Sequence, residues 1–400
     1  MSMDDIGTAD AARQPGHPVL ARLLARIEYG RLIVVTPEGD RLVGRGRMDG
    51  PEAELRLHSH RLFRRMLWNG DLGFAEGYFA GDWSTPDLPR LLEFAAANLG
   101  AVGRTVARNP FAALASRIGH FRRTNTRAGS RRNIAFHYDL GNEFYRLWLD
   151  RSMTYSSALY EHARVETLEA AQDAKIARIA TLLALEPGQR VLEIGCGWGA
   201  LAARLAAAGA HVTAITLSTE QKAEAEARAA RLGLAGRIEV RLQDYRDVTE
   251  SFDRIVSIEM IEAVGARYWT DYFGALRARL ARGGRAVVQA ITIDEARFED
   301  YRRRPDFIQR YVFPGGMLPT KTIMADEAAR AGLRLTGAEF FGASYARTLA
   351  EWRRRFLEVW PMIEAMGFDQ RFKRIWEYYL AYCEAGFRRG TIDVGLYVLE

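Results

Sequence analysis

The residues most clearly arranged for chemistry form a glycine-rich turn within Arg190–Gly199, which reads Arg-Val-Leu-Glu-Ile-Gly-Cys-Gly-Trp-Gly. Its first residues predict a short buried strand over 190–195, and an alanine- and leucine-rich helix is expected over 198–208. A strand, a glycine turn and a helix bring bare backbone close to a nucleotide-like ligand. The next strand candidate, 211–218, follows after one helix, as a βαβ unit requires.

The acidic residue in this turn indicates which of two classes of ligand the turn would bind. Dinucleotide-binding folds use G-x-G-x-x-G and hold a pyrophosphate at the helix N-terminus. Here Glu193 precedes the glycines, and its carboxylate would repel a pyrophosphate but attract a cationic group, such as the amino group of S-adenosylmethionine. The pattern therefore favours S-adenosylmethionine over a dinucleotide or a turn that only packs. The turn residues expected to bind it are Glu193, Gly195, Cys196, Gly197 and Gly199.

The chain has 400 residues, a formal net charge of +6 and two cysteines. This length suits about two to three domains. Neither Cys196 nor Cys383 stands at metal-ligand spacing, so we predict a reducing compartment and no metal site. No apolar run approaches the ~18 residues of a membrane span, so a soluble or peripheral cytoplasmic protein is expected. Arginines crowd 117–132, a pattern that fits nucleic acid, an anionic lipid surface or a solvated face.

Four parts are expected along the chain. They are a disordered start over 1–17, a small α+β module over 18–115, a basic linker over 116–132 and a catalytic domain over 133–400. In the module, the patterns predict helices at 17–28, 62–68 and 88–99, a hairpin at 31–43 and a strand at 53–58. A glycine- and aromatic-rich stretch, 70–83, lies between the last two helices.

Repeating βα units in the catalytic domain predict an α/β fold with a mainly parallel sheet. A long amphipathic helix over 165–185 precedes the glycine turn. Strands are expected at 190–195, 211–218, 237–243, 252–259 and 284–292, and helices at 198–208, 219–232 and 268–281. Segments 333–341 and 391–399 suit a closing antiparallel pair. Aromatic-rich helices over 301–311 and 349–382 are expected to enclose a substrate chamber.

Taken in order, several motifs resemble the cyclopropane fatty acid synthase family of S-adenosylmethionine-dependent methyltransferases, which includes the mycolic acid cyclopropane synthases. The motifs are His137–Asn142, Tyr155–Ser156, Val191–Gly199, Thr216–Gln221, Gln243–Asp247, Glu259–Gly265, Tyr311–Gly316, Phe341–Tyr345 and Tyr382–Cys383. The resemblance implies a class I methyltransferase sheet with helical insertions over the active site, plus a small lipid-facing N-terminal domain. It also implies methyl transfer to the double bond of an acyl chain in a membrane phospholipid.

The resemblance assigns further residues to the cofactor. Tyr155 and Ser156 match a pair that reaches its methionine part, and Thr216 and Leu217 belong to the motif after the second strand. Ser218 and Gln221 are expected at the ribose, although Ser-x-x-Gln is equally a capping box for the next helix. Gln243 and Asp244 are expected near the adenine, with a plain surface turn as the alternative.

Three residues match the reacting centre of the family. Glu262 follows the fourth strand, at the edge where open α/β sheets place their ligands, and matches a glutamate that holds a bicarbonate ion. Its alternative role is a carboxylate that interacts with a helix dipole. Tyr345 and Cys383 match a tyrosine and a cysteine of the same pocket, and the alternatives are packing against neighbouring side chains and a small core residue.

Three positions depart from the family pattern. Ser157 and Ala263 stand where the family has cysteine and histidine, and Gln289 replaces another histidine. Serine and glutamine still form hydrogen bonds to a small anion, but glutamine does not titrate. The bicarbonate that acts as the base in the family is therefore expected either in an altered pocket or not at all. We predict that methyl transfer is retained and that the product is a cyclopropane or, without ring closure, a methyl-branched or methylene chain.

Aromatic side chains have a second use in such a reaction, because ring faces stabilise a carbocation by about 1–2 kcal/mol each. The candidates, which otherwise line the acyl chain or fill the core, are Tyr138, Phe144, Tyr145, Tyr311, Phe313 and Tyr379.

The expected partners are an unsaturated phospholipid and an anionic inner membrane face, which the 117–132 arginines and the N-terminal module would contact. Homodimerisation is implied by the resemblance alone, and no nucleic acid is expected. Two other functions remain open: a small-molecule N- or O-methyltransferase and a non-catalytic lipid carrier.

Overall fold

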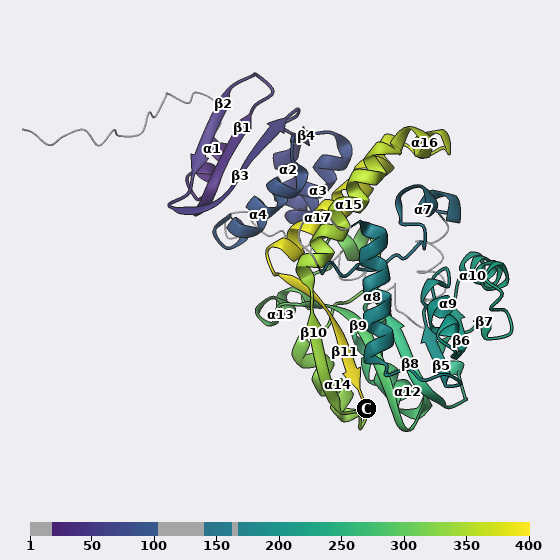
Figure 1. Cartoon of the computed structure of the whole chain (residues 1–400). Coiled ribbons are helices and arrows are strands. Elements are labelled where there is room, and N and C mark those ends of the chain that lie inside the picture. The colour runs from purple at the N-terminus through teal and green to yellow at the C-terminus, as the bar shows by residue number, and fades with distance from the viewer. Residues whose placement is uncertain (1–17, 103–139, 162–166) are drawn as a thin grey trace, which may run out of the picture.

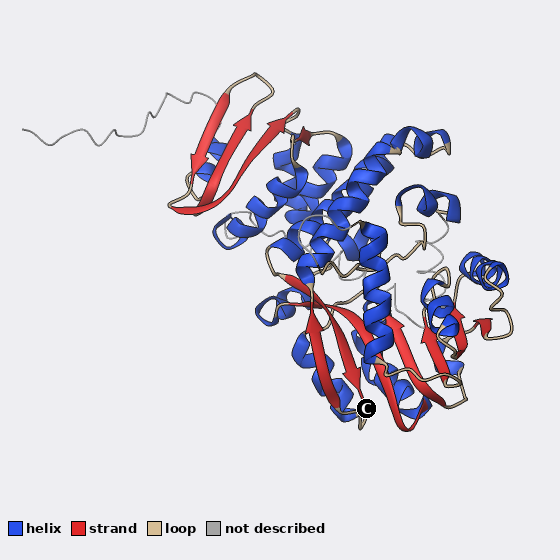
Figure 2. Ribbon diagram, in the orientation of Figure 1, coloured by secondary structure: helices blue, strands red, loops and turns tan. Residues whose placement is uncertain are grey.

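The computed structural model describes residues 18–102, 140–161 and 167–400. It contains a four-stranded sheet near the N-terminus and a seven-stranded sheet in the remainder, with long helices between them (Figures 1 and 2). Within the described ranges, no helix is both long enough and apolar enough to cross a bilayer. The predicted basic linker over 116–132 lies outside the described residues.

The large sheet has the strand order β10-β11-β9-β8-β5-β6-β7. Its parallel strands are β5 (Arg190–Ile194), β6 (His211–Thr216), β7 (Ile238–Leu242), β8 (Phe252–Ile258) and β9 (Leu280–Ile293). An antiparallel pair, β10 (Leu335–Phe340) and β11 (Ile392–Leu399), closes the edge beside β9. The predicted α/β sheet and its closing pair are therefore confirmed.

The order of these strands locates a ligand site. Chain order runs outward from β5 through β6 to β7 and then returns to β8 on the other side of β5, so that β5 pairs with both β6 and β8. In open α/β sheets, ligands bind outside the carboxyl ends of the strands at such a reversal. The glycine turn follows β5 at this point.

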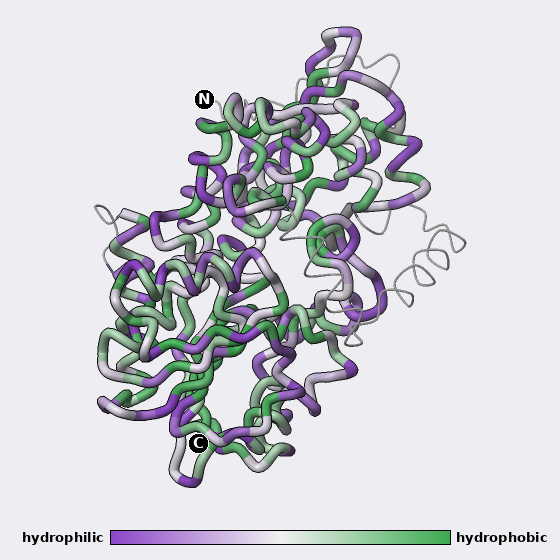
Figure 3. The backbone as a smooth tube through the Cα atoms, turned by 90° about the vertical axis from the view of Figure 1, so that its right-hand side faces the viewer, coloured by the Kyte–Doolittle hydropathy of each residue, from purple (hydrophilic) through white to green (hydrophobic). Residues whose placement is uncertain are grey.

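The sheet is covered by helices whose apolar faces form its core. Val191, Val256 and Val287 on adjacent strands are fully buried, and Figure 3 shows hydrophobic stretches in green through the part of the backbone near the C-terminus. The surrounding helices are α8 (Leu168–Leu182), α9 (Ala200–Ala207), α10 (Thr219–Arg231), α11 (Ile261–Val264), α12 (Trp269–Arg279) and α14 (Lys321–Arg330). The predicted helices at 198–208, 219–232 and 268–281 are confirmed, with slightly shorter bounds.

Within residues 18–102, the N-terminal module combines a sheet of order β2-β1-β3-β4 with four helices. Its elements are α1 (Pro18–Leu24), β1 (Tyr29–Val35), β2 (Arg41–Arg45), β3 (Met48–Leu57), α2 (Arg61–Asn69), α3 (Asp71–Ala80), β4 (Trp83–Ser84) and α4 (Leu88–Val102). The predicted β1–β2 hairpin is present. Helix α3 occupies the glycine-rich stretch, and Gly73 lets it touch α2, since a Cβ there would lie 2.2 Å from the Arg65 carbonyl oxygen.

Helices inserted around the sheet supply the remaining walls. They are α7 (Asn142–Trp148), α13 (Glu295–Arg303), a π-helical turn η3 (Ile308–Val312), α15 (Gly342–Glu358), α16 (Trp360–Ala365) and α17 (Gln370–Arg388). The single helices predicted over 301–311 and 349–382 are therefore wrong. Pro305 follows the end of α13, and the turns at Val359 and Gly367 divide the second segment into three helices.

The N-terminal module and these insertions share one core. Buried residues of α2, α3 and α4 belong to the same apolar cluster as those of α15 and α17. The Tyr78 hydroxyl donates to Glu377 at 2.9 Å, and the Tyr311 hydroxyl donates to Glu76 at 2.7 Å. Arg388 on α17 pairs with Glu93 on α4 at 3.0 Å. The N-terminal module therefore forms part of the wall of the catalytic region.

Candidate active site

The glycine turn after β5 uses three left-handed backbone conformations. Gly195, Gly197 and Gly199 have φ angles of +82°, +51° and +82°, a region that side chains disfavour. A Cβ on Gly197 would meet no atom within 4 Å, so this backbone is open to a ligand. A Cβ on Gly199 would lie 2.9 Å from that of Ala225, so this glycine serves the packing of α9 against α10.

Glu193, on β5, carries a buried carboxylate beside this turn. Its side chain is only 3% exposed, and its Oε2 atom has no hydrogen-bond partner within the described chain. Burial raises the pKa of Glu193 to about 8, while a hydrogen bond from the Ala202 backbone N–H and nearby Lys175 oppose the rise. A buried carboxylate oxygen without a partner is costly unless a ligand satisfies it. This oxygen fits the positively charged or hydroxyl groups of S-adenosylmethionine.

Lys175, on α8, had no role in the sequence analysis and lies at the centre of this region. Its Nζ donates to Ser156 Oγ at 2.6 Å, and the side-chain amide of Gln172 donates to the Ser156 carbonyl oxygen at 2.9 Å. Burial lowers the pKa of Lys175 to about 8. Both residues face inward with Ala171, Ile176 and Ile179, so their helical spacing was the available signal.

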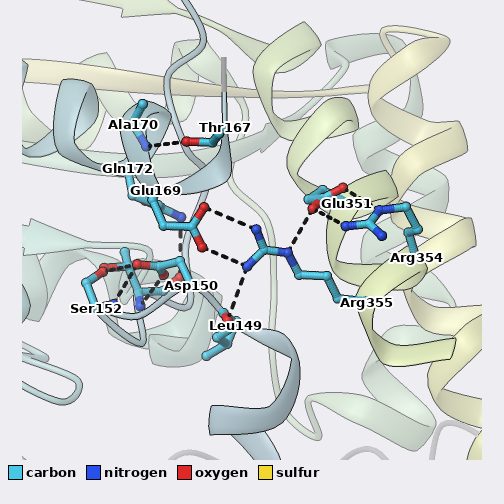
Figure 4. Close-up of polar contacts among 11 residues, drawn as sticks. Leu149, Asp150, Ser152, Thr167, Glu169, Ala170, Gln172, Glu351, Arg354 and Arg355 are labelled. Atoms are coloured by element: carbon cyan, nitrogen blue, oxygen red, sulfur yellow. Dashed lines mark hydrogen bonds and ion pairs between the residues drawn. The ribbon is translucent and has the colours of Figure 1, made fainter. Parts of the chain in front are cut away.

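The segment that carries Tyr155 and Ser156 is fixed from two sides. Asp150 accepts from the backbone N–H groups of Ser152 at 2.7 Å and Thr154 at 3.0 Å. Figure 4 shows Arg355 beside this turn, where its guanidinium donates to both oxygens of Glu169 and to Glu351. Helix α15 is thereby tied to the start of α8, next to the Tyr155 segment.

The Tyr155 side chain is held by two aromatic neighbours. Its hydroxyl shares a 2.9 Å hydrogen bond with that of Tyr379, and its ring lies 5.3 Å from the ring of Trp352.

The residues predicted at the ribose and adenine have different surroundings. The Ser218 hydroxyl accepts from the Gln221 backbone N–H at 3.2 Å, so the capping interpretation is confirmed. The Gln221 side chain accepts from Thr216 Oγ1 at 2.8 Å. Asp244 forms two hydrogen bonds with the Arg246 side chain, at 2.8 and 2.6 Å, and caps a short helical turn. Its predicted contact with adenine stays a prediction.

Glu259, directly after β8, is the main residue that the sequence analysis missed. Its Oε1 accepts from the Ser157 backbone N–H at 2.8 Å and from Gln289 Nε2 at 2.7 Å. Its Oε2 accepts from the Tyr345 hydroxyl at 2.6 Å. The three residues expected around a small anion therefore converge on a carboxylate of the protein. Ser157 contributes its backbone, because its hydroxyl donates to the Ala158 carbonyl oxygen.

Glu262, on α11, lies three residues beyond Glu259 in the chain. Its Oε1 accepts from the Ile291 backbone N–H at 2.6 Å, and its Oε2 is buried without a partner in the described ranges. Burial, followed by the nearby charge of Glu259, raises the pKa of Glu262 to about 8. Cys383 faces the same space, and burial raises the pKa of its thiol. Ala263, in place of a histidine, also borders this space.

One cavity of about 1630 Å³ joins these groups. It exceeds the roughly 300–1,000 Å³ of common small-molecule sites, so it has room for a second ligand beside a cofactor. The predicted residues at its wall are Tyr155, Ser156, Glu193, Gly195, Cys196, Gly197, Thr216, Leu217, Gln221, Gln243, Glu262, Tyr345 and Cys383. Within the described ranges, Ser157, Gly199, Ser218, Asp244 and Gln289 lie behind that wall.

The far part of the cavity is apolar and extends into the N-terminal module. Its wall there includes Leu62, Phe94, Phe307, Phe313, Leu349 and Tyr379. Of the aromatic residues predicted beside a carbocation, Phe313 and Tyr379 border the cavity. Phe144 and Tyr145 are buried in the core, and Tyr311 is bonded to Glu76. Tyr138 lies outside the described residues.

Comparison with known proteins places this architecture in a class. The solved structure of mycolic acid cyclopropane synthase CmaA1, complexed with SAH and CTAB, superposes with a TM-score of 0.63 and 30% identity, over 67% of this chain and 97% of that one. The chain is thus a class I S-adenosylmethionine-dependent methyltransferase, and S-adenosylmethionine is its cofactor.

The sequence comparisons define the family within that class. The family described as mycolic acid cyclopropane synthetase matches residues 125–396, and this chain belongs to it. Tuberculostearic acid methyltransferase UfaA1 of Mycobacterium tuberculosis is 43% identical over 351 residues, or 84% of this chain and 81% of that protein. Cyclopropane-fatty-acyl-phospholipid synthase of Escherichia coli K12 is 36% identical over 345 residues, or 86% of each chain.

Proposed function

We propose that this enzyme transfers a methyl group from S-adenosylmethionine to the double bond of an unsaturated acyl chain in a membrane phospholipid. The observation that carries the proposal is the single cavity that runs from the glycine turn, past Glu259 and Glu262, into an apolar space walled by the N-terminal module. The polar acceptor of a small-molecule methyltransferase would find few hydrogen-bond partners along this apolar wall. The paired buried carboxylates argue against a carrier without catalysis.

The residues would divide the work as follows. S-adenosylmethionine supplies the electrophilic methyl group. Glu193 and the open backbone at Gly197 hold its polar parts, and Lys175 positions Ser156 beside them. The apolar wall excludes water, which would otherwise trap a carbocation on the acyl chain. The rings of Phe313 and Tyr379 border the cavity and would stabilise that cation.

The decisive experiment supplies methyl-labelled S-adenosylmethionine and vesicles of monounsaturated phospholipid. Label is expected in the acyl chain, because only the double bond offers a nucleophile in the apolar space. Saturated phospholipid is the matched control and should remain unlabelled. Absence of label from every lipid, by an enzyme that binds S-adenosylmethionine, would refute the proposal. Label in a soluble amine or hydroxyl acceptor would favour the small-molecule alternative.

The product distinguishes two forms of this function. Proton loss with ring closure gives a cyclopropane, whereas proton loss without it gives a methylene chain that still contains a double bond. The names of the two relatives above cover both a cyclopropane synthase and a methyltransferase. Proton NMR of the labelled lipid separates the outcomes, since ring and vinyl hydrogens resonate far apart.

A lipid substrate requires contact with a membrane, and α2 offers a suitable surface. Leu67 and Trp68, at its end, are 55% and 60% exposed and also border the cavity. Arg61 and Arg64 are exposed on the same helix. A surface binds a bilayer when its apolar side chains insert into the lipid and its neighbouring cationic side chains face anionic headgroups. We propose that α2 docks the enzyme peripherally on the inner membrane face. The predicted contact through 117–132 and homodimerisation stay predictions.

The Trp68→Ser variant is expected to bind anionic vesicles about tenfold more weakly, because burial of such a side chain in lipid contributes about 1.5–3 kcal/mol. Vesicle co-sedimentation at several salt concentrations measures this. Leu232, which is 58% exposed beyond α10 and away from the cavity, provides the matched control in Leu232→Ser. Equal binding by the wild type and both variants would contradict docking through α2.

A further inference from the structure

The strongest unassigned feature of this site is the Glu259 carboxylate itself. Ser157, Gln289 and Tyr345 surround it with three donors at 2.6–2.8 Å. They come from a loop, from strand β9 and from helix α15. A carboxylate has about four lone-pair positions, so these donors leave one position on Oε2. When ionised, a carboxylate with these three donors keeps one acceptor position for an incoming proton.

The backbone at Glu259 indicates that the position is maintained for function. Its φ angle is +49°, one of only three positive values at non-glycine residues in the described ranges. A side chain in this region costs about 1–2 kcal/mol. Its N–H donates to the Gln289 carbonyl oxygen at 2.8 Å, which fixes the strained residue beside β9. Strain that is retained next to a ligand cavity points to a catalytic or binding role.

We propose that the Glu259 carboxylate is the base that removes the proton from the methylated acyl chain. The Glu259 side chain thereby takes the place of the bicarbonate ion whose role as base the family resemblance implies. The inference rests on the function proposed above. The side chain already accepts the hydrogen bonds of the three residues expected around that ion. A second anion there would also be repelled by the negative charge of Glu259.

Glu262 complements this role. Burial raises the pKa of both carboxyl groups, but Glu262 has one backbone donor to oppose the rise, whereas Glu259 has three donors and the nearby positive charge of Lys175. Hydrogen bonds to a carboxylate and an opposite charge favour its ionised form. Two adjacent buried carboxyl groups do not both ionise readily. The environment therefore favours a proton on Glu262 and a negative charge on Glu259.

The step balances without a further reactant. The π electron pair of the alkene forms a bond to the methyl carbon, and the sulfur–methyl bond breaks with its pair on sulfur. The neighbouring acyl carbon becomes cationic. A proton of the new methyl group passes to Glu259 Oε2, and the released C–H pair closes the ring. If a hydride first moves to the cationic carbon, the same proton loss leaves a methylene group instead.

The Glu259→Gln variant tests the base. It preserves the size of the side chain, and activity in the labelled-phospholipid assay is expected to fall about 10²–10⁴-fold while S-adenosylmethionine still binds. Glu327→Gln, a buried glutamate on α14 away from the cavity, is the matched control and should stay near the wild-type rate. Activity of Glu259→Gln within threefold of the wild type, or a severe loss in Glu262→Gln alone, would overturn the proposal.

The Glu259→Gly variant tests whether the side chain replaces an ion. Glycine relieves the backbone strain and leaves space for an anion where the Glu259 carboxylate was. Added bicarbonate should therefore increase the activity of this variant at least tenfold. The wild type should be unaffected when carbon dioxide is removed. A wild type that needs bicarbonate, or a glycine variant that it does not rescue, would refute the replacement.

Binding of ¹³C-bicarbonate, followed by NMR line broadening, separates this inference from the proposed function. Binding is expected for Glu259→Gly and not for the wild type. If the wild type labels no lipid, but bicarbonate still binds only to Glu259→Gly, the proposed phospholipid function is wrong. The inference that the Glu259 side chain occupies the anion position is then still supported. If the wild type labels lipid and also binds bicarbonate, the proposed function stands and the inference fails.

Discussion

The Glu193→Gln variant is expected to bind S-adenosylmethionine about ten- to hundredfold more weakly than the wild type. The buried Oε2 atom of Glu193 has no partner within the described chain, so the ligand would supply its only compensation. Hydrogen bonds to a charged group contribute about 1.5–3 kcal/mol, and each 1.4 kcal/mol is tenfold in affinity. Isothermal titration calorimetry measures the change.

The pH dependence gives this prediction a direction. Because the pKa of Glu193 is raised to about 8, its carboxyl group is largely protonated below that pH and ionises as the pH increases. A cationic ligand group prefers the ionised form, so wild-type affinity should increase from pH 6.5 to 9, and binding near pH 7 should release a proton. The glutamine variant removes this titration and controls for ionisation of the ligand. An unchanged affinity and the same pH profile in the variant would exclude Glu193 from the cofactor site.

The Trp352→Ala variant is expected to lose about 3–5 kcal/mol of unfolding free energy, the usual cost of deleting a fully buried large aromatic side chain. Trp352 is completely buried, and its ring lies 5.8 Å from that of Trp148 and 6.1 Å from that of Tyr345. It also supports the Tyr155 ring, so S-adenosylmethionine binding should weaken as well. Urea unfolding followed by fluorescence or circular dichroism measures the stability.

Trp352→Phe is the control for that result. The indole Nε1 atom of Trp352 is buried with no acceptor in the described ranges, so its removal costs no hydrogen bond. Phenylalanine keeps most of the apolar contact, and its loss should be clearly smaller than that of alanine. Equal destabilisation by both substitutions would contradict packing as the cause.

The sheet was predictable because each strand has a strong local pattern. Buried runs such as Ile255–Ile258 and Ala286–Ile291 fit central parallel strands, and glycine and capping signals mark where the next helices begin. Helix α3 had no such pattern, because Gly73 and Gly77 lower helix propensity. These glycines are explained only by close contact with α2 and Trp83, which a local sequence window does not contain.

The site was predictable in part for the same reason. The glycine turn is local, and Glu262, Tyr345 and Cys383 were identified through motifs. Glu259 shares with Glu262 the position after the fourth strand, but nothing local shows that its side chain is buried among hydrogen-bond donors. Its role depends on donors 30, 86 and 102 residues away in the chain. Lys175 was missed although it shares the inward helical spacing of Ile176 and Ile179, because lysines are rarely fully buried.

The shared core has a consequence for how the protein is made. Helix α3 rests on α17, and Tyr78 finds its carboxylate partner 299 positions later in the chain. During synthesis on the ribosome, the apolar face of the N-terminal module would emerge long before the surface that covers it. Such long-range closure slows folding and leaves early segments open to aggregation. We therefore expect nascent chains to require chaperone protection until α17 has left the exit tunnel.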